Sequence, residues 1–278
     1  MNRIQRASAV FALLSVGVIG ALPAWAGCKS KVWVESQERI ELSAGEVDEL
    51  EVGTHNGDIA VTAEEGSDQI IVVAKKRAGA PDEGQAQECM DALQITTEKS
   101  GRTQKLGRKL DRPKPSGWSV ELSFEVTVPP RLAVVAKAHN GGIKVTGVHG
   151  DCKLETHNGG ITAQTGSRRM NVKTHNGGAK ITTAANEVTM VSHNGGIEAK
   201  LDAPGDINGT ITNHNGGVAV EFGEQTATNL KCSVHNGRIQ CSRDLMDITR
   251  KRTHLAGRLG QSEAHLEIKT HNGSITIR

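Results

Sequence analysis

Aromatic residues are nearly absent from this sequence, whose 278 residues include three Trp, three Phe and no Tyr. Rings that could stack on sugars are therefore scarce, and a carbohydrate site built from stacked aromatics is disfavoured. An excess of charge of one sign is also lacking, because 33 Lys and Arg stand against 31 Asp and Glu. A balance this close to neutral does not indicate nucleic acid or a membrane surface as the partner.

Common enzyme motifs are missing as well, since the sequence has no nucleophile elbow, no HExxH zinc motif and no phosphate-binding loop. Catalysis requires one asymmetric set of acid, base or nucleophile in a pocket, whereas the reactive side chains of this chain recur in a repeat. We therefore predict a protein that is not an enzyme and needs no cofactor. A polysaccharide-active β-solenoid enzyme is the least favoured alternative.

The N-terminus has the form of a secretory signal peptide over residues 1–26. It has a basic start, an apolar stretch over residues 7–22 that is short for a bilayer span, and an Ala-x-Ala cleavage site ending at Ala26. We expect export to the periplasm or the cell envelope, or secretion. Two alternatives stay open: an uncleaved membrane anchor, and a lipid on Cys28, without which we expect no membrane attachment.

Five cysteines follow this segment, at positions 28, 89, 152, 232 and 241, and export would place them where disulfides can form. Because their number is odd, at least one thiol stays unpaired within the chain unless a lipid occupies Cys28. Cys232 and Cys241 flank His235, on strands that the intervening turn is expected to fold toward each other. We predict a disulfide between Cys232 and Cys241.

A repeated tripeptide, His-Asn-Gly, dominates the rest of the sequence. It occurs eight times, with histidines at 55, 139, 157, 175, 193, 214, 235 and 271. From His139 onward, successive histidines are 18, 18, 18, 21, 21 and 36 residues apart. We interpret the interval of 36 as two periods of 18, with residues 253–257 (THLAG) as a degraded copy between them. A fixed period of about 20 residues indicates stacked repeats that bury their apolar sides against one another.

Apolar or small residues alternate with polar ones on both sides of each turn. Around His157, for example, Leu154 precedes the turn, and Ile161 and Ala163 follow it. A period of two is typical of β-strands with one face inward, and Asn-Gly tolerates the positive φ of a tight reversal. The sequence therefore predicts an all-β protein, and two arrangements of its strands fit.

A parallel β-solenoid is the favoured arrangement, and an antiparallel β-meander with a hairpin at each Asn-Gly is the alternative. In-register coils, spaced about 4.8 Å apart, place each residue above its equivalent, which explains why the same letters recur at every level. A meander needs only residues compatible with a turn and would not require a histidine at the same position of every repeat. In a solenoid, an interval of 21 rather than 18 residues adds a bulge at the bend opposite the turn.

The main repeat region, residues 138–278, follows a less regular segment, residues 27–137. We predict that this segment contains strands and a short helix near 82–93, and that it forms an N-terminal β-rich cap continuous with the solenoid. Two basic stretches, residues 99–114 and 243–258, are interpreted as solvated loops.

The other end of the solenoid is expected to be bare, because the chain stops within a predicted strand at residues 274–278. An uncovered strand edge is a template for pairing with another chain. We therefore expect a protein or surface partner to dock at this open C-terminal edge, and we expect no nucleic-acid partner.

Stacking gives the repeated histidines and asparagines a structural role. By strand parity, Thr156, Thr174 and Ser192 face inward together with the asparagine of the following turn, so that the amides can hydrogen-bond from coil to coil in a ladder. The same parity sends the histidines outward. The predicted ladder residues are His139, Asn140, His157, Asn158, His175, Asn176, His193, Asn194, His214, Asn215, His235, Asn236, His271 and Asn272.

The histidine row leaves one alternative function open, a periplasmic metal-binding protein in which stacked imidazoles share zinc or copper. We predict no metal site, since zinc usually has three or four convergent ligands and a straight row offers two. A calcium-binding β-roll is disfavoured more strongly, because its repeats need carboxylates and only the first copy, at Asp58, has one.

The repeated (T/S)-x-N-G-(G/D)-I units follow a strand that ends in Val128, Pro129 and Pro130 and resumes at residues 132–136. This pattern resembles the bacterial β-strand-repeat "putative adhesin" family of exported β-solenoid proteins, over residues 31–278. The family pattern has a small polar residue in place of the histidine, so the resemblance implies no role for the histidines. We predict an exported, non-enzymatic β-solenoid that serves as a scaffold or an adhesion surface in the bacterial envelope.

Overall fold

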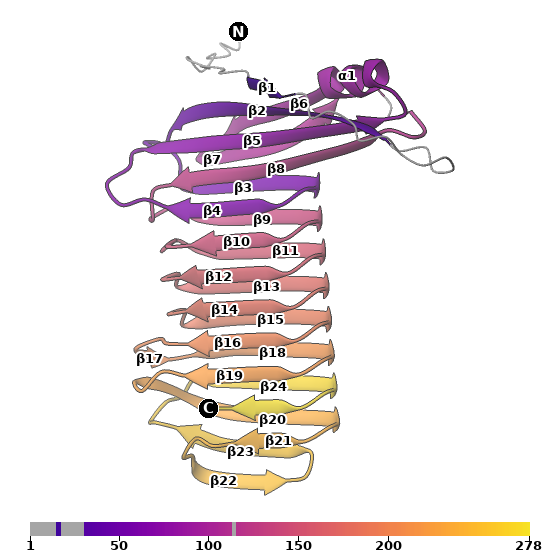
Figure 1. Cartoon of the computed structure of the whole chain (residues 1–278). Coiled ribbons are helices and arrows are strands. Elements are labelled where there is room, and N and C mark those ends of the chain that lie inside the picture. The colour runs from indigo at the N-terminus through magenta and orange to yellow at the C-terminus, as the bar shows by residue number, and fades with distance from the viewer. Residues whose placement is uncertain (1–14, 18–30, 113–114) are drawn as a thin grey trace.

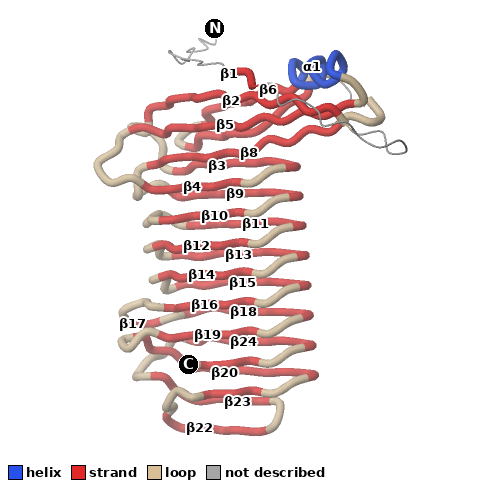
Figure 2. The backbone as a smooth tube through the Cα atoms, viewed as in Figure 1, coloured by secondary structure: helices blue, strands red, loops and turns tan. Residues whose placement is uncertain are grey.

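Two long β-sheets face each other and form a column with one helix at its N-terminal end (Figures 1 and 2). The computed structural model describes residues 15–17, 31–112 and 115–278, so most of the predicted signal peptide and Cys28 lie outside the described residues. The 12-stranded sheet, here called sheet A, contains in spatial order β1 (Ser15–Gly17), β2 (Val32–Ser43), β5 (Gln69–Ala80), β8 (Ser119–Val128), β4 (Ile59–Ala63), β10 (Ile143–Thr146), β12 (Ile161–Thr165), β14 (Ala179–Thr183), β16 (Ile197–Leu201), β19 (Val218–Phe222), β25 (Ile275–Ile277) and β21 (Ile239–Cys241). The 13-stranded sheet, sheet B, contains β22 (Met246–Lys251), β23 (His254–Leu259), β20 (Thr226–Asn236), β24 (His265–Asn272), β18 (Asn208–Asn215), β15 (Glu187–Asn194), β13 (Arg169–Asn176), β11 (Cys152–Asn158), β9 (Ala133–Asn140), β3 (Glu49–Asn56), β7 (Thr103–Leu110) and β6 (Leu93–Ser100), with β17 (Gly205–Asp206) beside β20.

Each repeat forms one coil, in which a strand of sheet B runs to the His-Asn-Gly corner and a strand of sheet A runs back. Neighbouring coils pair in parallel and in register, so that Thr156 lies beside Thr174, which lies beside Ser192. Beyond the corner, Ile161 pairs with Ala179 in the same way. The predicted parallel β-solenoid is therefore confirmed, and the antiparallel meander is excluded for these repeats.

The core lies between the two sheets and is made by the alternating apolar residues. In the coil of His175, Met170 and Val172 from β13 and Ala179 and Ile181 from β14 are all buried. Burying one large aliphatic side chain is worth about 1.5–3 kcal/mol. Because one coil buries only a few such side chains, each coil depends on its neighbours for stability.

The longer repeat intervals add residues at the bend opposite the corner, as predicted. Residues 184–186 join β14 to β15, whereas residues 202–207 join β16 to β18 and include β17. The corner itself keeps the same length, so the extra residues leave the His-Asn-Gly positions in register.

The last coil is not stacked in chain order. In sheet B, β24 lies between β18 and β20, and in sheet A, β25 lies between β19 and β21. The coil of His271 is thus inserted between the coils of His214 and His235, and Figure 1 shows its yellow strands within the orange part of the column. The chain reaches this position because residues 242–264 contain β22 and β23, which pair with each other on the far side of β20. β23 pairs antiparallel with β20, and the chain then returns to form β24 on the other side of β20.

This insertion shows that two predictions are wrong. Residues 253–257 are not a degraded coil, because His254 and Leu255 begin β23, which pairs antiparallel with β20. The C-terminal strand is not an open edge, because Ile275 pairs with Val218 on one side and with Ile239 on the other. The C-terminal strand therefore offers no unpaired edge for a partner.

The N-terminal cap is built mainly from antiparallel strands. β2, β5 and β8 extend sheet A beyond the first coil, and the β6–β7 hairpin extends sheet B. The helix α1 (Glu83–Ala92) begins after Asp82, whose side chain accepts a hydrogen bond from the backbone N–H of Gln85 (2.8 Å). The predicted short helix is confirmed, and no helix among the described residues is long and apolar enough to cross a membrane.

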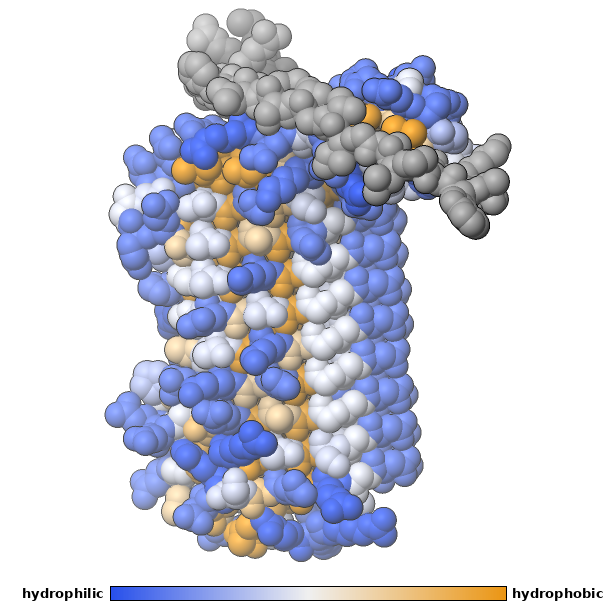
Figure 3. All heavy atoms as spheres, viewed as in Figure 1, coloured by the Kyte–Doolittle hydropathy of each residue, from blue (hydrophilic) through white to orange (hydrophobic). Residues whose placement is uncertain are grey.

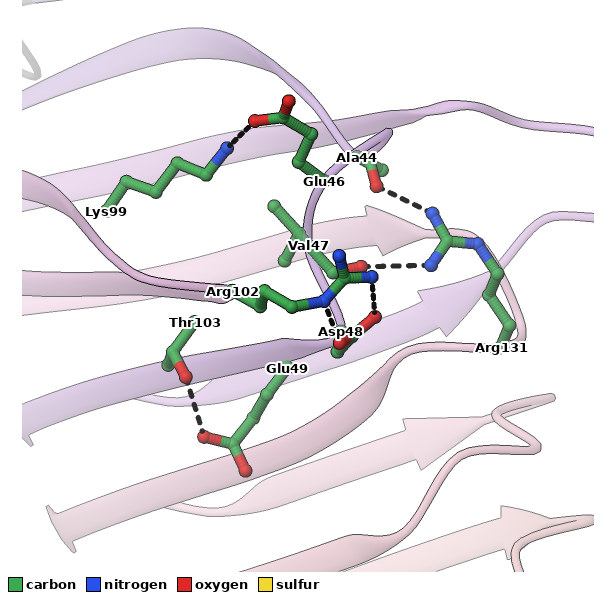
Figure 4. Close-up of polar contacts among 9 residues, drawn as sticks. All are labelled: Ala44, Glu46, Val47, Asp48, Glu49, Lys99, Arg102, Thr103 and Arg131. Atoms are coloured by element: carbon green, nitrogen blue, oxygen red, sulfur yellow. Dashed lines mark hydrogen bonds and ion pairs between the residues drawn. The ribbon is translucent and has the colours of Figure 1, made fainter.

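Polar contacts join the cap to the first coil (Figure 4). The guanidinium of Arg131 donates to two backbone carbonyls, those of Ala44 (2.6 Å) and Val47 (2.9 Å). Two ion pairs cross the same junction, Arg102 with Asp48 and Lys99 with Glu46. The charge-assisted bonds to the backbone fix the loop before β3, whereas exposed ion pairs contribute little.

Both basic stretches form strands, which corrects their interpretation as solvated loops. Residues 99–114 contain β7, and residues 243–258 contain β22 and most of β23. In β7, Gln104 and Leu106 are buried while Lys105 between them is exposed. Lys105 and Lys109 are exposed and Arg108 is half-buried, so the charged residues concealed the alternation in the sequence.

Cys232 and Cys241 are free thiols in the structure, which does not contain the predicted disulfide. The corner at His235 is not a hairpin, because it carries the chain from sheet B to sheet A, and β20 and β21 pair with different strands. Burial raises the pKa of Cys232 to about 12, which keeps its thiol protonated and unreactive.

Candidate functional site

The His-Asn-Gly corners line up along one edge of the column, which we name the HN edge. It is defined by the histidine and asparagine of each corner: His55, Asn56, His139, Asn140, His157, Asn158, His175, Asn176, His193, Asn194, His214, Asn215, His271, Asn272, His235 and Asn236. At each corner both side chains face outward, and His157 and Asn158 are both exposed. Figure 3 shows hydrophilic residues in an unbroken column down this edge.

The asparagines do not share the inward face with the hydroxyl residues that precede them, which corrects one prediction. Thr156, Thr174 and Ser192 are buried, with exposures of 2%, 0% and 1%. Asn158 and Asn176 are exposed. Strict alternation ends at the histidine because the chain bends there, so two consecutive side chains face solvent.

The asparagine side chains form a continuous column of hydrogen bonds. Each Nδ2 donates to the Oδ1 of the adjacent coil, at 2.7–2.9 Å, in the order Asn236, Asn272, Asn215, Asn194, Asn176, Asn158, Asn140 and Asn56. An amide has two N–H groups, so each interior asparagine retains one for another partner. The column therefore presents one amide N–H per coil.

The imidazole rings form a second column beside the asparagines. From His55 to His193, the ring centroids of successive coils are 4.6–4.8 Å apart. The step from His193 to His214 is wider, at 6.5 Å. The column then continues through His271 to His235, with steps of 5.0 and 4.5 Å.

Buried hydroxyls hold several of the corners against the adjacent coil. Each donates to the backbone carbonyl of the first glycine in that coil: Thr156 to Gly141 (2.8 Å), Thr174 to Gly159 (3.3 Å) and Ser192 to Gly177 (3.4 Å). A buried carbonyl without a partner would be costly, so these bonds stabilise the corners. The spacing of the imidazoles is consequently set by the backbone and does not depend on the rings themselves.

Shallow grooves run beside the imidazole column on the sheet B side. One, of about 540 Å³, is lined by His139, His157, His175 and His193 together with Lys137, Glu155 and Lys173. Another, of about 480 Å³, is lined by His193, His214, His235, His254, Lys269 and His271, among others. The grooves give an extended molecule access to several imidazoles at once.

The lysines of these grooves were not singled out from the sequence. Lys137, Lys173 and Lys269 each lie two residues before a corner histidine, on the outer face of sheet B. The hydrogen bond to Glu51 raises the pKa of Lys137, which therefore stays charged. The sequence signal for these lysines was their shared position two residues before a corner histidine, but that position holds a lysine in only some of the repeats.

Desolvation and the neighbouring rings of His139 and His175 lower the pKa of His157. The neutral form of His157 is thus favoured in the folded stack. In the unfolded chain, where a histidine titrates near about 6.5, this residue binds more of a proton than it does in the folded chain as the solution is acidified.

We expect the stack to lose stability as the pH falls below about 6.5, through the lowered pKa of His157. Thermal unfolding followed by circular dichroism at about pH 7.5 and about pH 5.5 measures this, and the midpoint should be lower in acid. The variant His157→Gln should show a smaller difference between the two pH values. Equal midpoints for the native chain would contradict the coupling of the rings.

The geometry of the column does not favour the metal-binding alternative. The rings of His55, His139, His157 and His175 are nearly parallel, with interplanar angles of 3°, 10° and 15°. The lone pairs of stacked rings lie in separate parallel planes and do not converge on one point. Among the described residues, no group of three or more His, Cys, Asp or Glu is placed to hold a metal ion.

No family model matches the sequence, and no curated protein matches it. Solved structures that resemble the chain include a putative cell adhesion protein from Clostridium sporogenes (10% identity, 87% of this chain and 98% of that chain, TM-score 0.40). Another is a putative adhesin from Bacteroides fragilis (11% identity, 87% of this chain and 97% of that chain, TM-score 0.43). A third is a putative lipid binding protein from Parabacteroides distasonis (11% identity, 87% of this chain and 96% of that chain, TM-score 0.35). Proteins named as putative adhesins are thus among the structures that resemble the chain. With TM-scores and identities this low, the likenesses carry no argument about what this chain binds.

Proposed function

We propose that this chain is an exported, non-enzymatic β-solenoid of the bacterial cell envelope that acts as an adhesion or interaction surface, with the HN edge as the surface that binds. The observation that carries the proposal is repetition, because eight corners expose the same imidazole and amide along one edge. A row of identical groups suits an extended or multivalent partner, since each coil adds a contact to the same partner.

The rigidity of the edge supports the same proposal. Hydrogen bonds between asparagines, and from buried hydroxyls to corner carbonyls, fix the exposed groups before any partner arrives. Binding to a pre-organised surface loses less conformational entropy than binding to mobile loops. The signal-like residues 1–26 support export.

The test is the binding of the purified, fluorescently labelled mature chain to isolated envelopes of the bacterium that makes it. We expect saturable binding that weakens at least about tenfold in the triple variant His157→Gln, His175→Gln, His193→Gln. The control is Arg168→Gln, Arg169→Gln, which removes charge at the opposite bend and should bind like the native chain. Failure of the native chain to bind, or equal binding by the triple variant, would refute the assignment of the HN edge.

A further inference from the structure

We propose that the HN edge binds a linear polyanion, an extended polymer with one carboxylate or phosphate in each repeating unit, and that it does so in mildly acidic solution. This inference rests on the proposed function, because it names the class of ligand for the same edge. Four features of the edge support it: the spacing of the rings, the balance of the surrounding charges, the protonation of the imidazoles and the free amide N–H groups.

The spacing suits a polymer better than a small ligand. Five consecutive rings, from His55 to His193, stand 4.6–4.8 Å apart in a straight row of parallel coils. The column extends through the inserted coil of His271 to His235. A small anion would meet one or two rings, whereas an extended polymer would meet a ring at each coil, and its affinity would grow with its length.

The fixed charges around the imidazoles nearly balance. The cations Lys137, Lys173, Lys269, Lys144, Lys180 and Arg238 lie near the carboxylates Glu51, Glu155, Glu267, Glu198 and Asp58, and His254 lies beside them. Ion pairs join Lys137 to Glu51 (2.8 Å), Lys173 to Glu155 (3.2 Å), Lys269 to Glu267 (2.7 Å) and Lys180 to Glu198 (3.8 Å). The net charge of this strip is therefore decided by the imidazoles.

Acid makes this strip cationic, because every imidazole that binds a proton adds a positive charge to the same row. Like charges at this spacing repel one another, and a bound polyanion relieves the repulsion. Binding and protonation are thus linked, so affinity rises as the pH falls. Free carboxylates stay ionised above about pH 4 and a free imidazole protonates below about pH 6.5, so mildly acidic solution leaves a window in which both partners can be charged.

The asparagine column adds neutral donors with the same repeat. Asn158 donates one N–H to Asn140 and accepts one from Asn176, which leaves its second N–H for a ligand oxygen. Because the amides are tied to one another, these donors cannot rotate away individually. An anionic group on the polymer can therefore meet an imidazolium and an amide N–H at the same coil.

The experiment titrates the native mature chain with polygalacturonate by calorimetry at low salt, at about pH 5.5 and about pH 7.5. We expect binding at least about tenfold tighter in acid, a marked loss of affinity with added salt, and monomeric galacturonate at least about a hundredfold weaker. Polyphosphate is titrated in parallel, and acid-dependent binding of either polymer supports the proposal. Neutral dextran should not bind.

The matched variants separate the HN edge from general charge. The triple variant His157→Gln, His175→Gln, His193→Gln should lose most of the gain in acid, whereas Arg168→Gln, Arg169→Gln should bind like the native chain. Circular dichroism at the lower pH confirms that each protein is folded. Equal affinity at both pH values, an equal loss in the arginine variant, or binding of neither polymer would overturn the proposal.

The two proposals fail differently. If the native chain binds envelopes through the HN edge at neutral pH but neither polyanion binds in acid, the ligand class is wrong and the proposed function stands. If the histidine variant binds envelopes as well as the native chain does, the assignment of the HN edge as the binding surface is wrong.

Discussion

Replacement of Gly195 by alanine is expected to destabilise the solenoid by about 3 kcal/mol, whereas the same change at Gly196 should stay within about 0.5 kcal/mol of neutral. A Cβ on Gly195 would lie 2.4 Å from the carbonyl oxygen of Gly177 and 2.5 Å from its carbon. These are backbone atoms of the preceding coil and cannot rotate away. Gly195 also has a φ of +141°, which L side chains rarely adopt.

Gly196 provides a matched control one residue further along the chain. Its Cβ would meet nothing closer than the Gly217 carbonyl oxygen at 3.6 Å, an ordinary contact. Urea unfolding of the two variants compares their free energies of unfolding directly. Similar values for both would mean that the corners do not pack as closely as the structure shows, and the spacing of the imidazoles would no longer follow from the backbone.

Deletion of residues 265–278 is expected to unfold the C-terminal coils, because it removes an interior layer of the stack. The lost strands bury Leu266, Ile268, Ile275 and Ile277, which together are worth on the order of 6 kcal/mol or more. The deletion also leaves β18 and β20 without their shared partner. Hydrogen exchange should show lost protection from β18 to β23, with protection retained from the cap to the coil of His175.

The control for the deletion is Thr276→Ala, which changes a half-buried residue of the same coil on its outer face and should leave exchange almost unchanged. Retention of full protection in β20 after the deletion would show that it can pair directly with β18. The inserted position of the last coil would then be unnecessary for stability.

The coil architecture was predictable because its signals are local. The alternation around each turn marks strands, Asn-Gly marks the corner, and a nearly fixed interval places Thr156, Thr174 and Ser192 at equivalent positions. The helix after Asp82 was predictable for the same reason, since its cap residue and apolar face lie within a few positions of each other.

The stacking order was not predictable, because nothing in a coil specifies which other coil is its neighbour. An interval of 36 residues fits two regular periods as well as it fits a hairpin that returns the chain to an earlier level. The likeness of residues 253–257 (THLAG) to the repeated corner supported the first interpretation, although most of them lie in β23, which pairs antiparallel with β20.

The chemistry of the edge was only partly predictable. The histidines were visible in the sequence as a repeat. Strand parity fails at a corner, however, and it wrongly predicted that the asparagines face inward. Lys137, Lys173 and Lys269 join the site through the register of sheet B, which appears only when the strands are assembled.

The continuity of the imidazole column depends on the inserted coil of His271, and oxidative cross-linking of engineered cysteine pairs tests it most directly. Thr212 pairs with Lys269, and Lys269 pairs with Ser233, so β18 and β20 are separated by one strand. Neighbouring strands are about 4.8 Å apart, within reach of a disulfide, whereas strands two apart are about 9.6 Å apart and out of reach. In a Cys241→Ser background, we expect cross-links in Thr212→Cys/Lys269→Cys and in Lys269→Cys/Ser233→Cys, and none in Thr212→Cys/Ser233→Cys. A cross-link in the third pair and none in the first would contradict the stacking order and the continuity of the imidazole column.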